Sequence, residues 1–226
     1  MNLVKSILNI RFETATEPWL AMREILRSAA ADPKAEIQAA PVVVDRPKDR
    51  KRIMLQVRAA GLEHELAGSD SSIKGAIKET LEIFIGLHKA SPFPAVAQMS
   101  YNVFLIEPFP VPFHELVGFM KARYLLPSRL SDTASDIGLT FDRHEEGLQK
   151  HVQIGPMDKT QLQSQFLRWP AKGIPDTFVF LDLGYTSTVG GMAFSQSALE
   201  SFLEQATDWQ VAEAASVIAE LKDGGG

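Results

Sequence analysis

Three side chains with reactive oxygen atoms stand close together in the last part of the sequence. Asp182, Tyr185 and Thr186 follow an apolar stretch, residues 178–181, and offer a carboxylate, a phenol and a hydroxyl. Such side chains, placed in a pocket between a sheet and its helices, would form the polar end of a small-ligand site. We therefore take these three residues as the candidate ligand-binding set.

The same stretch resembles the first phosphate loop of the actin, hexokinase and Hsp70 superfamily, in which an apolar strand delivers an Asp, a Gly and hydroxyls to nucleotide phosphates and magnesium. In that superfamily the loop opens a domain, and a second phosphate loop follows far downstream. Only a short remainder of this chain follows Thr188. The favoured interpretation is a buried central strand that enters a Gly-rich loop at Gly190 and Gly191, so no cofactor is expected.

A second chemical feature is the charged run from residue 46 to residue 52. Arg50, Lys51 and Arg52 lie at its end and would contact phosphates if the tip of a hairpin met nucleic acid. Asp45 and Asp49 partly neutralise the run, and no aromatic side chains interleave with it to stack on bases. These three cations are the candidate nucleic-acid contacts, but nucleic-acid binding is the less favoured interpretation.

Other reactive residue types do not converge. The chain contains no Cys, which excludes a disulfide, a thiolate metal site and a Cys nucleophile. His144 has Asp142, Glu145 and Glu146 near it, but this group falls at an expected hairpin turn, where charged side chains are usually solvated. We assign no catalytic residue and no metal ligand.

Length and charge limit the class of protein. The chain has 226 residues, enough for a sizeable hydrophobic core, and a net charge of -5, which gives no global attraction for nucleic acid or an anionic membrane. Its first residues alternate apolar with polar types and do not resemble a signal peptide or membrane span. We expect a cytoplasmic protein without membrane contact.

Hydrophobic periodicity predicts the same order of elements twice, on either side of Pro92 and Pro94. Each half reads as a strand, a helix, several strands and a long helix. In the first half, strands are expected at 3–13, 37–44, 53–58 and 62–66, and helices at 16–31 and 72–88. In the second half, strands are expected at 101–105, 137–143, 148–154, 162–169 and 177–185, and helices at 113–126 and 195–221.

This order predicts an α+β fold with an N-terminal half, 1–93, and a C-terminal half, 94–226, or one continuous domain. Strands grouped after a single helix favour an antiparallel sheet with helices on one face. Two such halves would form a continuous curved sheet, similar to the TATA-binding-protein or helix-grip architectures. The internal pseudo-repeat is one of pattern only.

The middle of the chain also resembles a sporadically distributed family of uncharacterised prokaryotic proteins of similar length. Members carry Gly-Leu-Arg-Tyr-Ile-Asn on a central strand, followed by an apolar corner with a short helix and later by an apolar strand with an Asp-rich turn. The counterparts here are residues 98–102, 107–109, 116–119 and 180–182, although the Gly, the Arg and the residue between Tyr and Asn are absent. The resemblance implies a prokaryotic origin and leaves the activity unknown.

Three functions follow from these observations. The first is a non-enzymatic protein-binding or assembly component, with a protein partner or a second copy, because antiparallel strands abound and reactive side chains do not converge. The second is a small-ligand-binding protein or enzyme with a pocket between sheet and helices. The third is nucleic-acid binding through the 46–52 hairpin.

Overall fold

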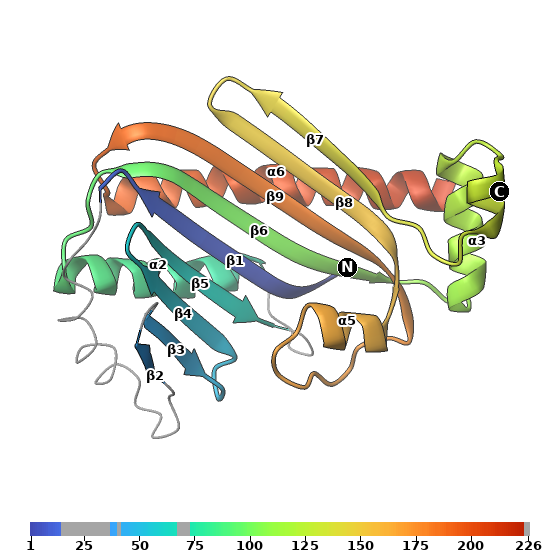
Figure 1. Cartoon of the computed structure of the whole chain (residues 1–226), viewed down its shortest axis with the longest axis horizontal. Coiled ribbons are helices and arrows are strands. Elements are labelled where there is room, and N and C mark those ends of the chain that lie inside the picture. Colours follow the sequence, from blue (N-terminus) through green and yellow to red (C-terminus); the bar gives the residue numbers. More distant parts are fainter. Residues whose placement is uncertain (15–36, 40–41, 67–72, 224–226) are drawn as a thin grey trace.

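Nine strands form one antiparallel sheet in the order β2-β3-β4-β5-β1-β6-β9-β8-β7 (Figure 1). The structure is a computed structural model that describes residues 1–14, 37–39, 42–66 and 73–223. The helix predicted at 16–31 lies outside the described residues. The strands are β1 (Asn2–Phe12), β2 (Ile37–Ala39), β3 (Val42–Arg46), β4 (Lys51–Gln56), β5 (Ala59–Glu65), β6 (Val96–Pro108), β7 (Leu139–Glu145), β8 (Leu148–Asp158) and β9 (Thr177–Met192).

The described helices are α2 (Ile73–Ala90), α3 (Phe113–Tyr124), α4 (Arg129–Thr133), α5 (Lys159–Gln165) and α6 (Gln196–Asp223). The α+β class and the antiparallel sheet are therefore confirmed. Ser195 caps the last helix, because its Oγ accepts a hydrogen bond from the Ala198 amide at 3.1 Å. None of the helices in the described residues is both long enough and apolar enough to cross a lipid bilayer.

The two halves of the chain join in the middle of the sheet. Strand β1 pairs with β5 on one side and with β6 on the other, with Leu8 opposite Tyr101. Strand β9 then lies between β6 and β8, although β7 and β8 precede it in the sequence. A single sheet therefore runs through both halves.

One face of the sheet, the covered face, packs against the long helices α2 and α6, which lie behind the strands in Figure 1. Alternating strand residues such as Leu8, Tyr101 and Leu183 point into this core and are at most 1% exposed. Gln210 of α6 is fully buried there, and its Nε2 donates to the main-chain oxygens of Tyr101 and Leu183 at 2.9 Å each. These bonds fix α6 across β6 and β9.

The opposite face has a second, smaller apolar core at one end only. Phe104 of β6 and Phe180 of β9 point outward there, with ring centroids 5.8 Å apart. They are covered by the strap, which we define as residues 159–176, comprising α5 and the loop that follows. Phe166 of the strap packs against Phe180 in a tilted arrangement, with ring centroids 4.6 Å apart. Helices thus occupy both faces, whereas the sequence predicted one.

Two predicted strands are wrong. The strand predicted at 162–169 is α5 and the start of its loop, because Asp158 and Gln161 form a reciprocal capping box with bonds of 2.8 and 3.0 Å. The single strand predicted at 37–44 is two strands, β2 and β3, which pair antiparallel with Ile37 opposite Val44.

Candidate functional site

The sequence-predicted ligand set is divided between the two faces of the sheet. Asp182 and Thr186 lie on the face opposite α2 and α6, because alternate strand residues share a face. Tyr185 points to the covered face, is 7% exposed, and packs against Phe202 and Trp209 with centroid distances of 5.8 and 5.9 Å. Tyr185 is therefore part of the core, and Asp182 and Thr186 belong to a different surface.

We call that surface the open face: the part of the sheet opposite α2 and α6 that the strap leaves uncovered. It crosses β1, β6, β9, β8 and β7, which are neighbours in the sheet. Its side chains are mostly neutral amides and hydroxyls that are half-buried or exposed. They include Asn9, Ser100, Asn102, Thr186, Gln149 and Gln153.

Three strands bring their polar side chains together at the centre of the open face. Asn102 of β6, Gly184 of β9 and His151 of β8 stand in one cross-strand row. A Cβ on Gly184 would lie 2.8 Å from Asn102 Nδ2 and 3.2 Å from the Cβ of His151, so glycine is needed for their close approach. Asn102 Nδ2 in turn donates to Asp182 Oδ1 at 3.4 Å.

His151 is oriented by a carboxylate from the edge strand. Its Nδ1 lies 2.8 Å from Asp142 Oδ1, so Nε2 is the ring nitrogen left for other contacts. On the other side, burial raises the pKa of the Asp182 carboxyl, while the hydrogen bond from Asn102 and the nearby His151 act in the opposite direction.

The hydrogen-bond partner of the His151 ring is the Asp142 carboxylate, which orients the imidazole. No three His, Asp or Glu side chains converge as metal ligands within the described residues. His144, which the sequence places near Asp142, Glu145 and Glu146, lies at the exposed end of β7. The open face therefore offers amides, hydroxyls, the Asp182 carboxylate and the imidazole of the Asp142–His151 pair.

A pocket of about 330 Å³ adjoins the open face beside the strap. Its walls include Asp136, Gln153, Gln161, Phe166 and Phe180. Gln153 stands directly opposite Asp182 in the β8–β9 register, so the pocket and the open face are continuous. Asp136 Oδ2 accepts a hydrogen bond from Gln161 Nε2 at 3.3 Å, which places a carboxylate in the pocket wall.

The predicted nucleic-acid contacts are each bound to another part of the chain. Lys51 Nζ lies 2.6 Å from Glu79 of α2, and Arg52 Nε lies 3.7 Å from Asp45. Arg50 donates to the main-chain oxygen of Pro170 in the strap at 2.6 Å. These contacts favour a structural role for the three cations.

Glu65 and Arg50 hold the strap against the first half of the sheet. The Glu65 side chain is 0% exposed and accepts bonds from the amides of Arg168 at 2.6 Å and Trp169 at 3.2 Å, and from Arg50 at 3.2 Å. Lys5 adds a bond of 3.2 Å to the Phe166 main-chain oxygen. Burial raises the Glu65 pKa, although these amides and cations oppose the change.

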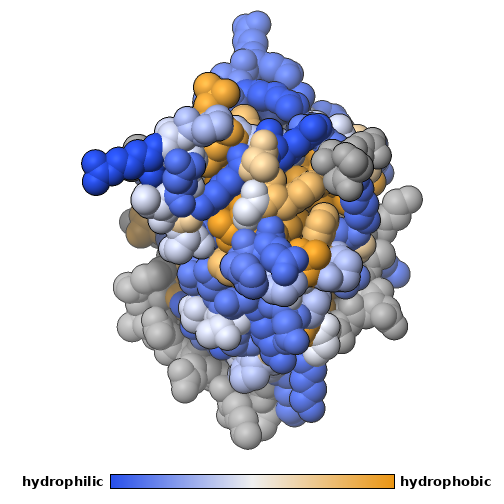
Figure 2. Space-filling view, turned by 90° about the vertical axis from the view of Figure 1, so that its right-hand side faces the viewer, coloured by the Kyte–Doolittle hydropathy of each residue, from blue (hydrophilic) through white to orange (hydrophobic). Residues whose placement is uncertain are grey.

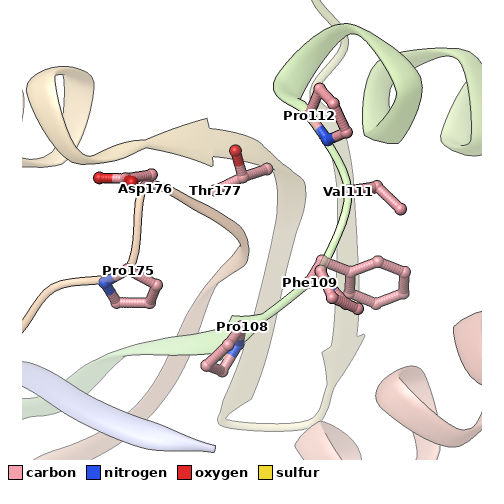
Figure 3. A pocket seen from close by; sticks show the side chains of 8 residues that line it. Pro108, Phe109, Val111, Pro112, Pro175, Asp176 and Thr177 are labelled. Carbon is pink, nitrogen blue, oxygen red and sulfur yellow. The ribbon is translucent and has the colours of Figure 1, made fainter.

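A second pocket, of about 540 Å³, lies at the proline corner after β6 (Figure 3). Pro108, Pro110 and Pro112 are exposed there, but the side chains of Phe109 and Val111 point away from Asp176 and pack against the covered-face core. Figure 2 shows apolar side chains gathered at this end of the molecule, near α3. At this corner Phe109 and Val111 therefore extend the covered-face core.

No family model matches the sequence, and a search of curated proteins found no match either. The functional inference therefore comes from the side chains of this chain. Sequence reasoning missed Asn102 and His151. One signal was present, because His151 and Gln153 alternate with the apolar Val152 and Ile154 along β8.

Proposed function

We propose that this protein is a non-enzymatic binding protein that holds an extended segment of a partner protein on its open face. The observation that supports the proposal is the composition of that face: amides and hydroxyls, with Asp142, His151 and Asp182 among them, on five neighbouring strands that the described part of the chain leaves uncovered. The absence of Cys from the sequence favours a reducing cytoplasm as its setting.

Amide and hydroxyl side chains match the chemistry of a polypeptide. Asn102 and Gln153 each offer a donor and an acceptor, and Ser100 and Thr186 offer a hydroxyl with both capacities. Peptide groups likewise donate once and accept once per residue. A face of this kind binds a segment by hydrogen bonds across several strands, with little of the apolar burial that a permanent interface uses.

The order of strands supports a related proposal about architecture. In each half, the strand that precedes the long helix lies beside the first strand of that half: β5 beside β1, and β9 beside β6. We propose that this arrangement is an internal pseudo-repeat similar to the TATA-binding-protein or helix-grip sheets.

A random peptide display library tests the proposal, with selection against the unmodified protein. Ser100 and Thr186 stand opposite each other in the middle of the open face. Ser100→Trp or Thr186→Trp would fill this surface, and we expect about a tenfold or greater loss of affinity for the selected peptides. Ser201→Trp places the same bulk on the exposed side of α6 and should leave the affinity unchanged.

The proposal also covers a second copy of the chain as the partner. Light scattering would then show a dimer that Thr186→Trp converts to monomer and Ser201→Trp does not. The proposal is overturned if selection yields no peptide and the protein is monomeric, or if both open-face variants, checked to be folded by thermal unfolding, bind the selected peptides normally.

A further inference from the structure

The pocket beside the open face has a lining that distinguishes it from the open face itself. It lies between the residues that lead into β7, the end of β8, and α5. None of its lining residues is Lys, Arg or His, whereas Asp136 contributes a carboxylate. The rest of the polar lining consists of the side-chain amides of Gln153, Gln161 and Gln165.

Asp136 is held in place by its neighbours. Its Oδ1 accepts the Ile137 amide at 2.7 Å, and its Oδ2 accepts Gln161 Nε2 at 3.3 Å. Gly155 lets this segment approach β8, because a Cβ there would meet the Ile137 main-chain oxygen at 2.9 Å. The carboxylate keeps further lone pairs for a ligand, since an ionised carboxylate accepts about four hydrogen bonds.

The apolar part of the lining suits an alkyl stem. It includes Met157, Phe166 and Phe180, with Phe180 only 2% exposed. Aromatic faces also attract cations. A volume of about 330 Å³ is at the small end for a ligand pocket, which suits one side chain better than a complete metabolite.

Charge complementarity then selects the ligand. We propose that this pocket takes a basic side chain, lysine or arginine, of the segment that binds to the open face. The ammonium or guanidinium group bonds Asp136 and the glutamine amide oxygens, while its methylene stem packs on Met157 and Phe166. A second carboxylate, Asp182, stands next to Gln153 at the pocket's border with the open face and adds to the negative potential there. The proposal rests on the proposed function, because the main chain of the segment lies on the open face.

The test uses capped pentapeptides of Gly and Ser with a central arginine, lysine or norleucine. Titration of the full chain is followed by NMR through the side-chain amide signals of Gln153, Gln161 and Gln165. We expect the arginine and lysine peptides to shift these signals and to bind about tenfold or more tightly than the norleucine peptide, as for one charge-assisted contact. Added salt should weaken the binding.

Asp136→Asn keeps the shape of the residue and removes its charge, so it should abolish the preference for the basic peptides. Asp208→Asn makes the same change in net charge on the exposed side of α6 and should have no effect. Equal binding of the norleucine peptide, or an unchanged preference in Asp136→Asn, would overturn the pocket assignment.

The two proposals fail in different ways. If library peptides depend on Ser100 and Thr186 but contain no excess of basic residues, the pocket assignment is wrong and the proposed function stands. If the basic pentapeptides bind through Asp136 but no selected segment and no second copy depends on the open face, the proposed function is wrong.

Discussion

The two faces of the central strands differ in composition, although the side chains of each strand point alternately to one face and to the other. On β6, Tyr101 and Val103 point to the covered face and are 0% exposed, whereas Ser100 and Asn102 between and beside them remain half-buried on the open face. The covered face provides the apolar burial that drives folding. The open face is left with groups that bond equally well to water or to a partner.

The face opposite α2 and α6 is itself divided into an apolar part and a polar part. The strap covers the end of β6 and β9 where Phe104 and Phe180 point outward, and it ends where the outward residues become Asn102 and Gly184. The strap therefore covers the apolar part of this face and leaves the polar part uncovered. The uncovered polar part is a distinct surface with its own composition.

The largest difference should appear when a side chain is shortened on each face. Leu183 is fully buried on the covered face, and Leu183→Ala should lower the free energy of unfolding by about 3 kcal/mol, through lost burial and the cavity it leaves. Thr186→Ala, on the open face of the same strand, should change it by less than about 0.5 kcal/mol. Urea unfolding monitored by circular dichroism measures both, and equal losses would remove the distinction between the faces.

The second difference concerns pH on the covered face. Burial, with a contribution from Lys51, lowers the pKa of His64 from 6.5 to about 4, although Glu79 acts in the opposite direction. As the pH falls, the imidazole is therefore protonated in the unfolded chain before it is protonated in the folded protein. His64 thus contributes stability that is present above pH 6.5 and is lost as the pH falls toward 4. The loss should reach about 3 kcal/mol.

His64→Gln isolates this contribution, since other groups also titrate in the same range. Unfolding free energies at pH 7 and near pH 4 should fall less steeply in the variant than in the unmodified protein. Parallel pH profiles for the two proteins would show that His64 is not responsible.

The smallest change in stability is expected at Asp182 on the open face. Its dependence on pH should have the opposite sign to that of His64. Burial raises its pKa in the folded state, so the folded protein favours the protonated form and is penalised once the carboxyl ionises. Asp182→Asn should therefore raise the stability at pH 7 by roughly 0.5 kcal/mol. The gain should vanish in acid, where the carboxyl is protonated in both states.

Asp208→Asn is the matched control for this measurement, because Asp208 is exposed on α6. A gain of equal size in both variants would assign the effect to net charge. Opposite pH slopes for His64 and Asp182 would instead show the same effect at both sites, because burial disfavours the charged form of a base and of an acid alike.

Local sequence patterns were sufficient for much of the fold. The alternation of Leu8, Ile10 and Phe12 predicts β1, and Ser195 predicts the start of α6. The α5 error was avoidable, because Asp158 followed three residues later by Gln161 is a capping-box signature. Alternation alone also places Tyr185 on the face opposite Asp182 and Thr186.

The candidate site depends on information that local patterns lack. Asn102 and Asp182 meet because β6 and β9 pair in one particular register, and their positions are 80 residues apart in sequence. His151 joins them because β8 pairs with the other edge of β9. Strand order and register are set by the whole sheet, so no spacing in the sequence indicates these neighbours.

The late position of β9 in the chain has a consequence for synthesis on the ribosome. Strand β6 ends at Pro108, and the strand that covers its free edge begins only at Thr177. At about 5 to 20 residues per second, this edge waits roughly 3 to 14 s before its partner begins to be made. The β7–β8 hairpin meanwhile lacks β9, the strand through which it joins the sheet. Nascent chains should therefore be most prone to aggregate, and most dependent on chaperones, in the interval before β9 emerges.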